Sequence, residues 1–169
     1  MQQNTLSGKA IVYGDDVDTD VIIPARHCTS YDPEELGRHC MEDLDPDFPS
    51  KVNPGDVIVA GENFGCGSSR ENAPIAIKGA GISACIARSF ARIFYRNSIN
   101  IGLPIIESSE LVDETQEGDP LNIDLPGGVI TNKRTGKEYK VPSFPPGILA
   151  IVEAGGMVEY TKKKLDKRR

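Results

Sequence analysis

The feature that most constrains the fold is the segment 61–72, which has the sequence GENFGCGSSREN. It follows an apolar run, residues 56–60, that is typical of a buried strand, and it precedes a stretch, residues 73–80, that is typical of a helix. Its glycines permit a tight loop in which the backbone can approach a ligand closely. Since a helix N-terminus offers free N–H groups to an anion, the sequence predicts an anion site at a strand end of an α/β sheet.

The segments on either side alternate between strand-like and helix-like patterns. Strands are predicted at 6–13, 82–87 and 102–106, and helices at 33–44, 74–78 and 90–97. Asp32 is predicted to cap the first helix with Glu35 completing a capping box, and Ser89 is predicted to cap the last. This order indicates an α/β core, and we expect one domain over residues 1–169.

The C-terminal third shows a different pattern. Short β-like segments at 121–124, 129–132 and 138–141 are separated by turn residues, which predicts a meander added to the core. The pattern of residues 146–164 predicts a helix, with a break at Gly155 and Gly156. The spacing of Arg88, Arg92 and Arg96 would place them on one helix face, either as a solvated basic surface or as a positive field near the loop.

Composition narrows the class of protein. The net charge of −6 argues against nucleic acid as the main partner, and no apolar run approaches the ~20 residues that span a membrane. The N-terminal residues show no secretory signal, so we expect a cytoplasmic protein with four free cysteines, Cys28, Cys40, Cys66 and Cys85. His27-Cys28 and His39-Cys40 form two similar pairs, but the second falls in the predicted helix, where neighbours point in different directions. We therefore expect no metal site in this chain.

The segment 15–26, DDVDTDVIIPAR, opens with four aspartates in six residues, and these aspartates cannot belong to the core. We expect its apolar run, 21–24, to pin the acidic turn to the core and so to fix Arg26 in space. An anion-binding role for Arg26 is then reasonable, beside the alternative that it is a surface residue.

Several known phosphate and nucleophile motifs are excluded for the loop. The third glycine of a dinucleotide fingerprint and the lysine of a P-loop are both missing, and no histidine follows residue 39 to complete a triad in that order. What remains is a hydroxyl beside an arginine. Ser68 in a water-poor, positive pocket could act as an alkoxide base, with Arg70 and Arg26 binding carboxylates. The alternative is a serine-capped helix with a surface arginine.

Four motifs in order carry a resemblance that covers nearly the whole chain. They are 18–24 (DTDVIIP), 65–72 (GCGSSREN), 89–97 (SFARIFYRN) and 102–104 (GLP). Together they resemble the small subunits of the aconitase-type hydro-lyases, the 3-isopropylmalate dehydratase and homoaconitase small-subunit family. The resemblance implies the swivelling β/β/α fold of the aconitase C-terminal domain. It also implies a separate large subunit, in a heterodimer or heterotetramer, that carries a [4Fe–4S] cluster, so that no cofactor is bound by this chain.

The resemblance further implies the chemistry: dehydration of a substituted malate to a cis-alkene diacid and rehydration with the hydroxyl moved. By position, Ser68 matches the base serine, Ser69 and Arg70 match its substrate-binding neighbours, and Arg26 is a candidate for the arginine of the first loop. Thr29 aligns with the position that selects the substrate, where an arginine accompanies a third carboxylate and an aliphatic residue accompanies an isopropyl group.

Thr29 supplies no charge for a third carboxylate, which favours a dicarboxylate with a small apolar substituent. The most favoured substrate is isopropylmalate, an intermediate of leucine biosynthesis. Homoaconitate, citramalate and dimethylmalate hydratases are the alternatives. A non-catalytic anion-binding or regulatory module is the alternative of a different class.

Overall fold

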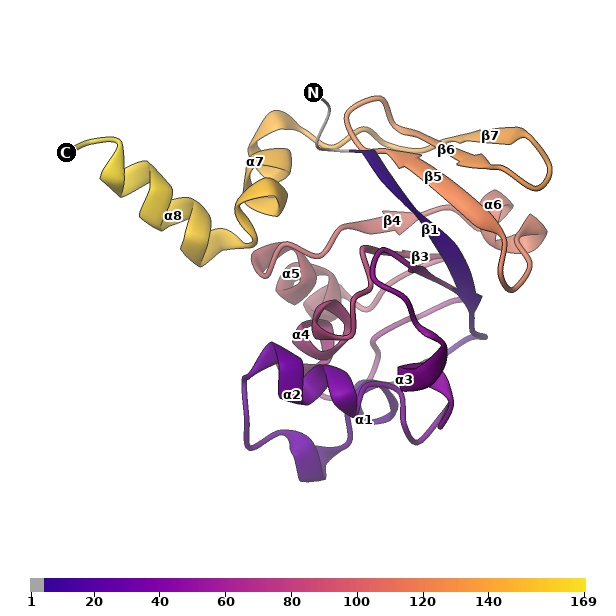
Figure 1. Ribbon diagram of the computed structural model, residues 1–169, viewed down its shortest axis with the longest axis horizontal. Coiled ribbons are helices and arrows are strands. Elements are labelled where there is room, and N and C mark those ends of the chain that lie inside the picture. The colour runs from indigo at the N-terminus through magenta and orange to yellow at the C-terminus, as the bar shows by residue number, and fades with distance from the viewer. Residues whose placement is uncertain (1–4) are drawn as a thin grey trace.

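A mixed sheet of seven strands organises the chain, whose residues 5–169 are described by a computed structural model (Figure 1). The strand order is β4-β3-β2-β1-β5-β6-β7. The strands are β1 (Thr5–Val12), β2 (Val57–Ala60), β3 (Ala84–Ala87), β4 (Ile105–Glu107), β5 (Pro120–Asp124), β6 (Val129–Asn132) and β7 (Lys137–Lys140). The expected absence of a secretory signal falls partly on residues 1–4, which lie outside the described residues.

The helices lie in the connections between these strands, except for the last two, which follow β7. They are α1 (Thr19–Ile22), the 3-10 turn η1 (Ala25–His27), α2 (Pro33–Arg38), α3 (Phe48–Lys51), α4 (Asn72–Gly79), α5 (Arg92–Asn100), α6 (Ser109–Glu114), α7 (Pro146–Ala154) and α8 (Met157–Asp166). The predicted break at Gly155 and Gly156 is confirmed, since α7 ends at Gly155 in the left-handed conformation. No helix among residues 5–169 is both long enough and apolar enough to cross a membrane.

Strand β1 belongs to both halves of the sheet. Its first part pairs antiparallel with β5, with Leu6 opposite Ile123, and its last part pairs parallel with β2, with Ala10 opposite Val57. Strands β2, β3 and β4 continue in parallel, while β5, β6 and β7 form the antiparallel meander. The predicted α/β core and the added meander are therefore both confirmed.

The parallel strands are buried on both faces, because side chains alternate between the faces of a sheet. In β2, Ile58 faces a core formed with α1, α2, α4 and α5, whereas Val57 and Val59 face a second core under the meander and α6. All four residues of this strand are fully buried. This rigid strand ends where the glycine-rich loop begins.

The first predicted helix is shorter than expected. Asp32 does cap α2, but α2 ends at Arg38 and the chain turns through Met41, whose φ is +63°. The N–H of Met41 then donates to the carbonyl of Ile22, and Leu44 is left exposed. The capping box is also wrong, because the N–H of Asp32 bonds the hydroxyl of Ser30 and not the carboxylate of Glu35.

The predicted cap of the next helix is wrong too. Helix α5 begins at Arg92, and the hydroxyl of Ser89 accepts a hydrogen bond from the N–H of Asn63 in the glycine-rich loop. Arg88 lies outside the helix and pairs with Asp113. The continuous basic face predicted for the three arginines therefore does not form.

Candidate active site

The glycine-rich loop leaves β2 and enters α4, as the sequence predicts. Gly65 and Gly67 have φ values of +82° and +94°, which residues with a side chain rarely adopt. A Cβ at Gly65 would overlap the ring of Phe94, and one at Gly67 would lie 2.5 Å from Oδ2 of Asp18. These glycines are required both by backbone conformation and by close packing.

The acidic turn braces the loop from one side. The N–H of Thr19 donates to the carbonyl of Cys66 at 2.8 Å, and the N–H of Gly65 donates to the carbonyl of Val17 at 2.8 Å. The hydroxyl of Thr19 also donates to the carbonyl of Ser68 at 2.9 Å. Because the buried run that contains Ile22 holds this turn against the core, the expected pinning of the acidic segment is confirmed.

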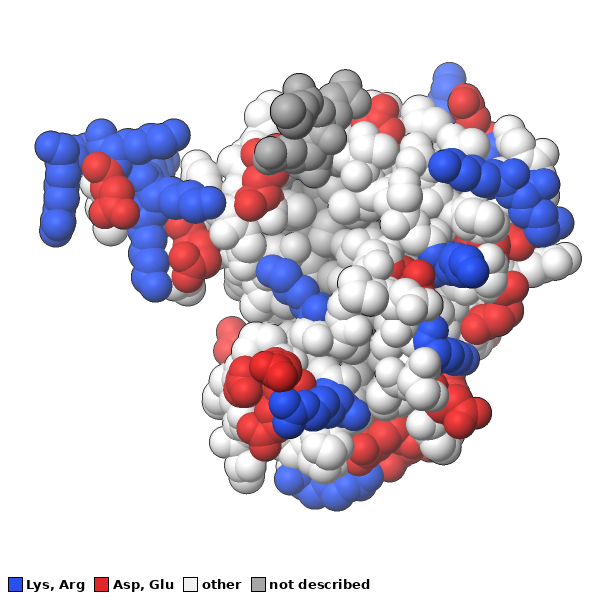
Figure 2. All heavy atoms as spheres, in the orientation of Figure 1, with Lys and Arg blue, Asp and Glu red and all other residues white. Residues whose placement is uncertain are grey.

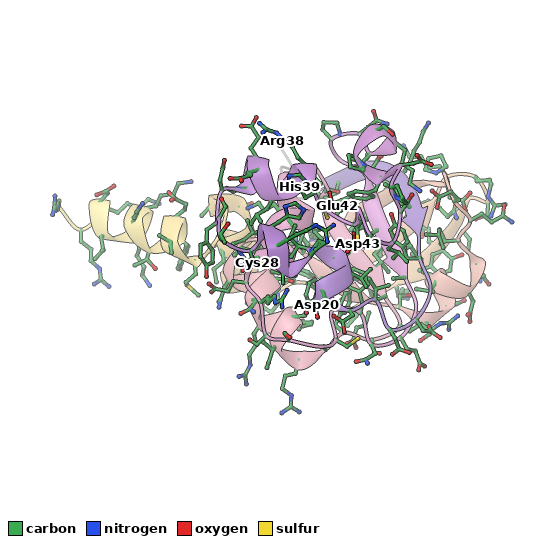
Figure 3. All side chains as sticks on the ribbon, turned by 90° about the horizontal axis from the view of Figure 1, so that it is seen from below. Asp20, Cys28, Arg38, His39, Glu42 and Asp43 are labelled. Carbon is green, nitrogen blue, oxygen red and sulfur yellow. The ribbon has the colours of Figure 1, made fainter. Side chains whose placement is uncertain are left out.

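Arg70 lies between the acidic turn and the segment that precedes α2. Its Nη1 atom is 2.6 Å from Oδ1 of Asp20 and 3.9 Å from Sγ of Cys28, two residues labelled in Figure 3. The side-chain amide of Asn72 donates to the carbonyl of Ser30 at 2.8 Å, which ties the same segment to the start of α4. The guanidinium is therefore oriented by contacts from both neighbouring segments.

Ser68, Ser69 and Arg70 line a hollow of about 180 Å³. The first residues of α5 form its opposite wall. The lining residues outside the loop are Thr19, Ala91, Arg92, Ile93, Phe94 and Asn97. Both serines are exposed, so the expected water-poor pocket around Ser68 is not formed by the described residues of this chain alone.

Arg92 and Asn97 are site residues that the sequence analysis did not assign. The four-residue spacing of the arginines predicts one shared helix face, but α5 begins only at Arg92. Arg92 lines the hollow, whereas Arg96 lines a separate groove beside β4. Among residues 5–169, the side chain of Arg92 forms neither a hydrogen bond nor an ion pair, so its charge is available to an anion in the hollow.

Arg26 is not brought to this hollow. Its Nη2 atom lies 2.6 Å from Oε1 of Glu42 and 2.7 Å from Oδ1 of Asp43. Glu42 also contacts Nε2 of His27 at 2.6 Å and Nδ1 of His39 at 2.9 Å, and the two imidazole rings stack with centroids 3.7 Å apart. Figure 3 shows His39, Glu42 and Asp43 together on the turn after α2. The substrate-binding role of Arg26 stays a prediction.

Glu42 is the centre of this cluster. Burial raises the pKa of its carboxyl, but hydrogen bonds from His39, His27 and Arg26 outweigh burial and lower the pKa to about 2. The ligand-type atoms of His27, His39 and Glu42 lie within 4.8 Å of one another, as a metal site requires. However, the carboxylate already accepts hydrogen bonds from three cationic or polar side chains, and parallel rings cannot both aim nitrogen lone pairs at one ion.

Thr29 is exposed and follows Cys28, the residue that contacts Arg70. The structure thus places Thr29 on the segment between η1 and α2, beside the residues that orient the arginine. Its predicted role in substrate selection is not tested by this geometry.

The family model described as Aconitase C-terminal domain matches residues 29–110. Proteins named 3-isopropylmalate dehydratase small subunit from Caldanaerobacter subterraneus and Thermodesulfovibrio yellowstonii are each 58% identical over 160 residues. These alignments cover 95% of this chain and 99% and 95% of the two relatives. This chain belongs to the 3-isopropylmalate dehydratase small-subunit family.

A crystal structure of a family member supports the fold directly. The 3-isopropylmalate dehydratase chain from Methanocaldococcus jannaschii superposes with a TM-score of 0.90, at 51% identity, over 97% of each chain. The predicted fold of the aconitase C-terminal-domain type is therefore confirmed.

The cysteines of the present chain do not fit an iron–sulfur cluster. Burial raises the pKa of the Cys40 and Cys85 thiols, and burial together with Asp18 raises that of Cys66. An iron–sulfur cluster is typically held by four cysteine thiolates that converge on it. Within residues 5–169, no three cysteines lie close enough to share one metal centre.

Proposed function

We propose that this chain is the small subunit of a two-subunit hydro-lyase that interconverts 2-isopropylmalate and 3-isopropylmalate in leucine biosynthesis. The observation that carries the proposal is the 58% identity, over nearly the whole length, to proteins named as such small subunits. An exposed serine beside an oriented arginine, on a glycine-rich loop at the end of a strand, supplies the groups that such a reaction needs.

Ser68 is the proposed base. As an alkoxide it would take the proton from the carbon next to a carboxylate, while the hydroxyl leaves the adjacent carbon and an alkene diacid results. The reverse addition, with hydroxyl and hydrogen exchanged between the two carbons, gives the isomer. Arg70 and Ser69 would hold a carboxylate, and the unpaired Arg92 would strengthen the positive field that favours the alkoxide.

The open hollow supports the need for a partner. With Ser68 exposed, water competes for every hydrogen bond at the site, and catalysis of this kind gains from excluding it. We propose that a large subunit covers the hollow in a cytoplasmic heterodimer or heterotetramer. The [4Fe–4S] cluster is assigned to that subunit, because the described cysteines of this chain do not fit one.

The substrate assignment depends on the segment that carries Thr29. A threonine offers no charge to a third carboxylate, and leaving a buried carboxylate unpaired costs several kcal/mol. A substituted malate with two carboxylates is therefore favoured. Arg26 could contribute only if its guanidinium exchanged Glu42 and Asp43 for a substrate carboxylate.

Reconstitution with the large subunit tests the proposal. The chain and the cluster-bearing subunit are co-expressed without oxygen, and formation of the unsaturated diacid is followed by its ultraviolet absorbance. We expect no turnover from either chain alone, and turnover of the complex with isopropylmalate above citramalate, dimethylmalate and homoaconitate. Activity of the purified chain alone would contradict the split site. A tight complex inactive on every malate derivative would instead favour a non-catalytic anion-binding module.

A further inference from the structure

Helix α8 projects away from the body of the molecule (Figure 1). None of its residues is buried, and Met157, Val158 and Leu165 are exposed by 39%, 66% and 55%. An isolated helix of ten residues is marginal in water, because tertiary packing supplies most helical stability. The helix is therefore expected to pack against a surface outside its own chain.

The corner before α8 is firmly built, so the direction of the helix is fixed. The ammonium of Lys78 donates to the carbonyls of Ile101 at 2.7 Å and Gly155 at 3.1 Å. A Cβ at Gly102 would lie 2.9 Å from the backbone of Gly155, and one at Gly156 would lie 2.9 Å from the carbonyl oxygen of Asn100. This close backbone contact holds α8 out from the body as a rigid arm.

The exposed apolar residues of α8 share one face. Val158 and Leu165 are seven residues apart, which is two helical turns, and Thr161 lies between them with its hydroxyl bonded to the carbonyl of Met157. The face is thus a small residue flanked by two larger apolar ones. In an antiparallel pair of identical helices centred between Thr161 and Lys162, each Val158 would meet the other Leu165, and the small side chain of Thr161 beside the axis would let the helices approach.

The C-terminal segment that contains α8 and the rest of the chain carry net charges of opposite sign. Residues 157–169 contain six lysines and arginines against two carboxylates, so they carry +4 and, given −6 overall, the remainder carries −10. In Figure 2 the projecting helix is covered with basic side chains, and acidic ones gather on the part of the body that carries α2. A second copy of this chain therefore offers a surface of the opposite charge.

A groove at the start of α8 could receive the basic end of α8 from a second copy. It has a volume of about 400 Å³, and Tyr31, Pro33, Ile75 and Val158 are among its lining residues. The neighbouring residues at the start of α2, including Glu34, are acidic and exposed. An antiparallel pair of α8 helices would bring the basic end of one helix to the base of the other, beside this groove and its acidic rim.

We propose that α8 is a dimerisation arm, which packs antiparallel against α8 of a second copy of this chain and places its basic end at the partner's acidic groove. The interface is isologous, since the same face serves both copies. It lies on an element that does not line the Ser68 hollow, so it is independent of the proposed function.

Sedimentation velocity of the full chain, alone and at micromolar concentration, tests the arm. We expect about twice the 18.3 kDa chain mass, a weaker dimer at high salt, and loss of the dimer in Leu165→Glu. The matched control is Lys163→Glu on the opposite face of α8. Lys163→Glu changes the net charge by two units and Leu165→Glu by one. We nevertheless expect the dissociation constant of the dimer to rise by roughly tenfold or more in Leu165→Glu and by less in Lys163→Glu. Circular dichroism reports whether each variant folds.

A cross-link tests the antiparallel arrangement separately. Thr161→Cys near the two-fold axis should form an intermolecular disulfide on mild oxidation, whereas Lys163→Cys and the unaltered chain should not. A monomeric chain, a dimer that survives Leu165→Glu, or a dimer without the Thr161→Cys cross-link would each overturn the proposal. The proposal would also be overturned if the chain were monomeric and α8 were required only for binding the large subunit or anionic phosphatidylserine vesicles.

Discussion

Arg70 is paired with Asp20 across 2.6 Å, although the two residues come from segments fifty positions apart in the sequence. Asp20 is itself held, because its N–H donates to the carboxylate of Asp18 at the start of α1. The arginine that is proposed to bind a substrate carboxylate is thus oriented before substrate arrives. Substrate must compete with Asp20 for the guanidinium or bind its remaining N–H groups.

Replacing Asp20 with asparagine tests this orientation. We expect Asp20→Asn to lower kcat/KM of the reconstituted enzyme by about tenfold, with most of the change in KM, because Arg70 would sample more positions. Steady-state kinetics provide the measurement. Asp113→Asn is the matched control, since it removes the partner of Arg88 at another surface arginine and should leave both constants unchanged. Equal losses in the two variants would show a general effect of charge.

Ser68→Ala tests the base. Removing a general base lowers turnover by about 10²–10⁴-fold, so we expect nearly complete loss of activity with the complex still formed. Because the Ser68 side chain is exposed, the melting temperature of the variant should not change. Turnover and co-elution with the large subunit are measured together. Ser143→Ala, a hydroxyl outside the hollow, is the control, and unchanged turnover in Ser68→Ala would remove this residue from its role.

Thr29→Arg tests substrate selection. A guanidinium at this position would pair with a third carboxylate, so we expect the ratio of kcat/KM for homoaconitate to that for isopropylmalate to rise by about 10–100-fold. Ala25→Arg places the same charge on η1 and should leave the ratio unchanged. A competition assay with both substrates measures the ratio directly. If the two variants behave alike, selection does not depend on Thr29.

The positions of the strands and of the loop were predictable, because hydrophobic periodicity and glycine punctuation are local properties. The ends of the helices were harder to predict from the sequence. Nothing local shows that Met41 turns to give its N–H to Ile22, or that Ser89 bonds Asn63 and not the end of α5. At Met41 a tertiary hydrogen bond is made where the pattern predicts that the helix continues, and at Ser89 a tertiary hydrogen bond replaces the predicted cap.

The side-chain partners in the site were the hardest to predict. The four aspartates of the acidic turn look equivalent in sequence, yet only the fold shows that Asp20 pairs with Arg70. The stacking of His27 on His39 depends on the early end of α2, which turns His39 toward η1. Long-range pairs of this kind are set by topology, which local patterns do not encode.

Gly65→Ala tests the constraint on the loop. The φ of +82° costs a residue with a side chain about 1–2 kcal/mol, and the overlap with Phe94 adds to it. We expect a total destabilisation of about 2–4 kcal/mol, which thermal unfolding would report as a fall of roughly 4–16 °C in Tm. Gly14→Ala is the control, since its Cβ would meet no atom within 4 Å. A similar Tm for both variants would show that the loop can adapt.

Glu42 gives a prediction for acid stability. Its pKa is lowered from the usual value near 4.5 to about 2 by hydrogen bonds from His39, His27 and Arg26, against the effect of burial. The ionised form therefore stabilises the fold at a pH above the usual pKa near 4.5, and this contribution is lost as the pH falls toward 2. With the carboxylate about one-quarter exposed, the contribution is about 1–2 kcal/mol.

Glu42→Gln should remove that contribution and release the segment that holds Thr29. We expect a lower free energy of unfolding at pH 7, a smaller dependence of stability on pH between about 4 and 2, and faster amide exchange in residues 25–31. Urea unfolding at several pH values and hydrogen exchange measure these effects. Glu34→Gln breaks an exposed ion pair with Arg38 and is the control, since such pairs contribute little. If Glu42→Gln changed acid stability but not exchange in 25–31, the cluster would support the turn after α2 without holding the segment that carries Thr29.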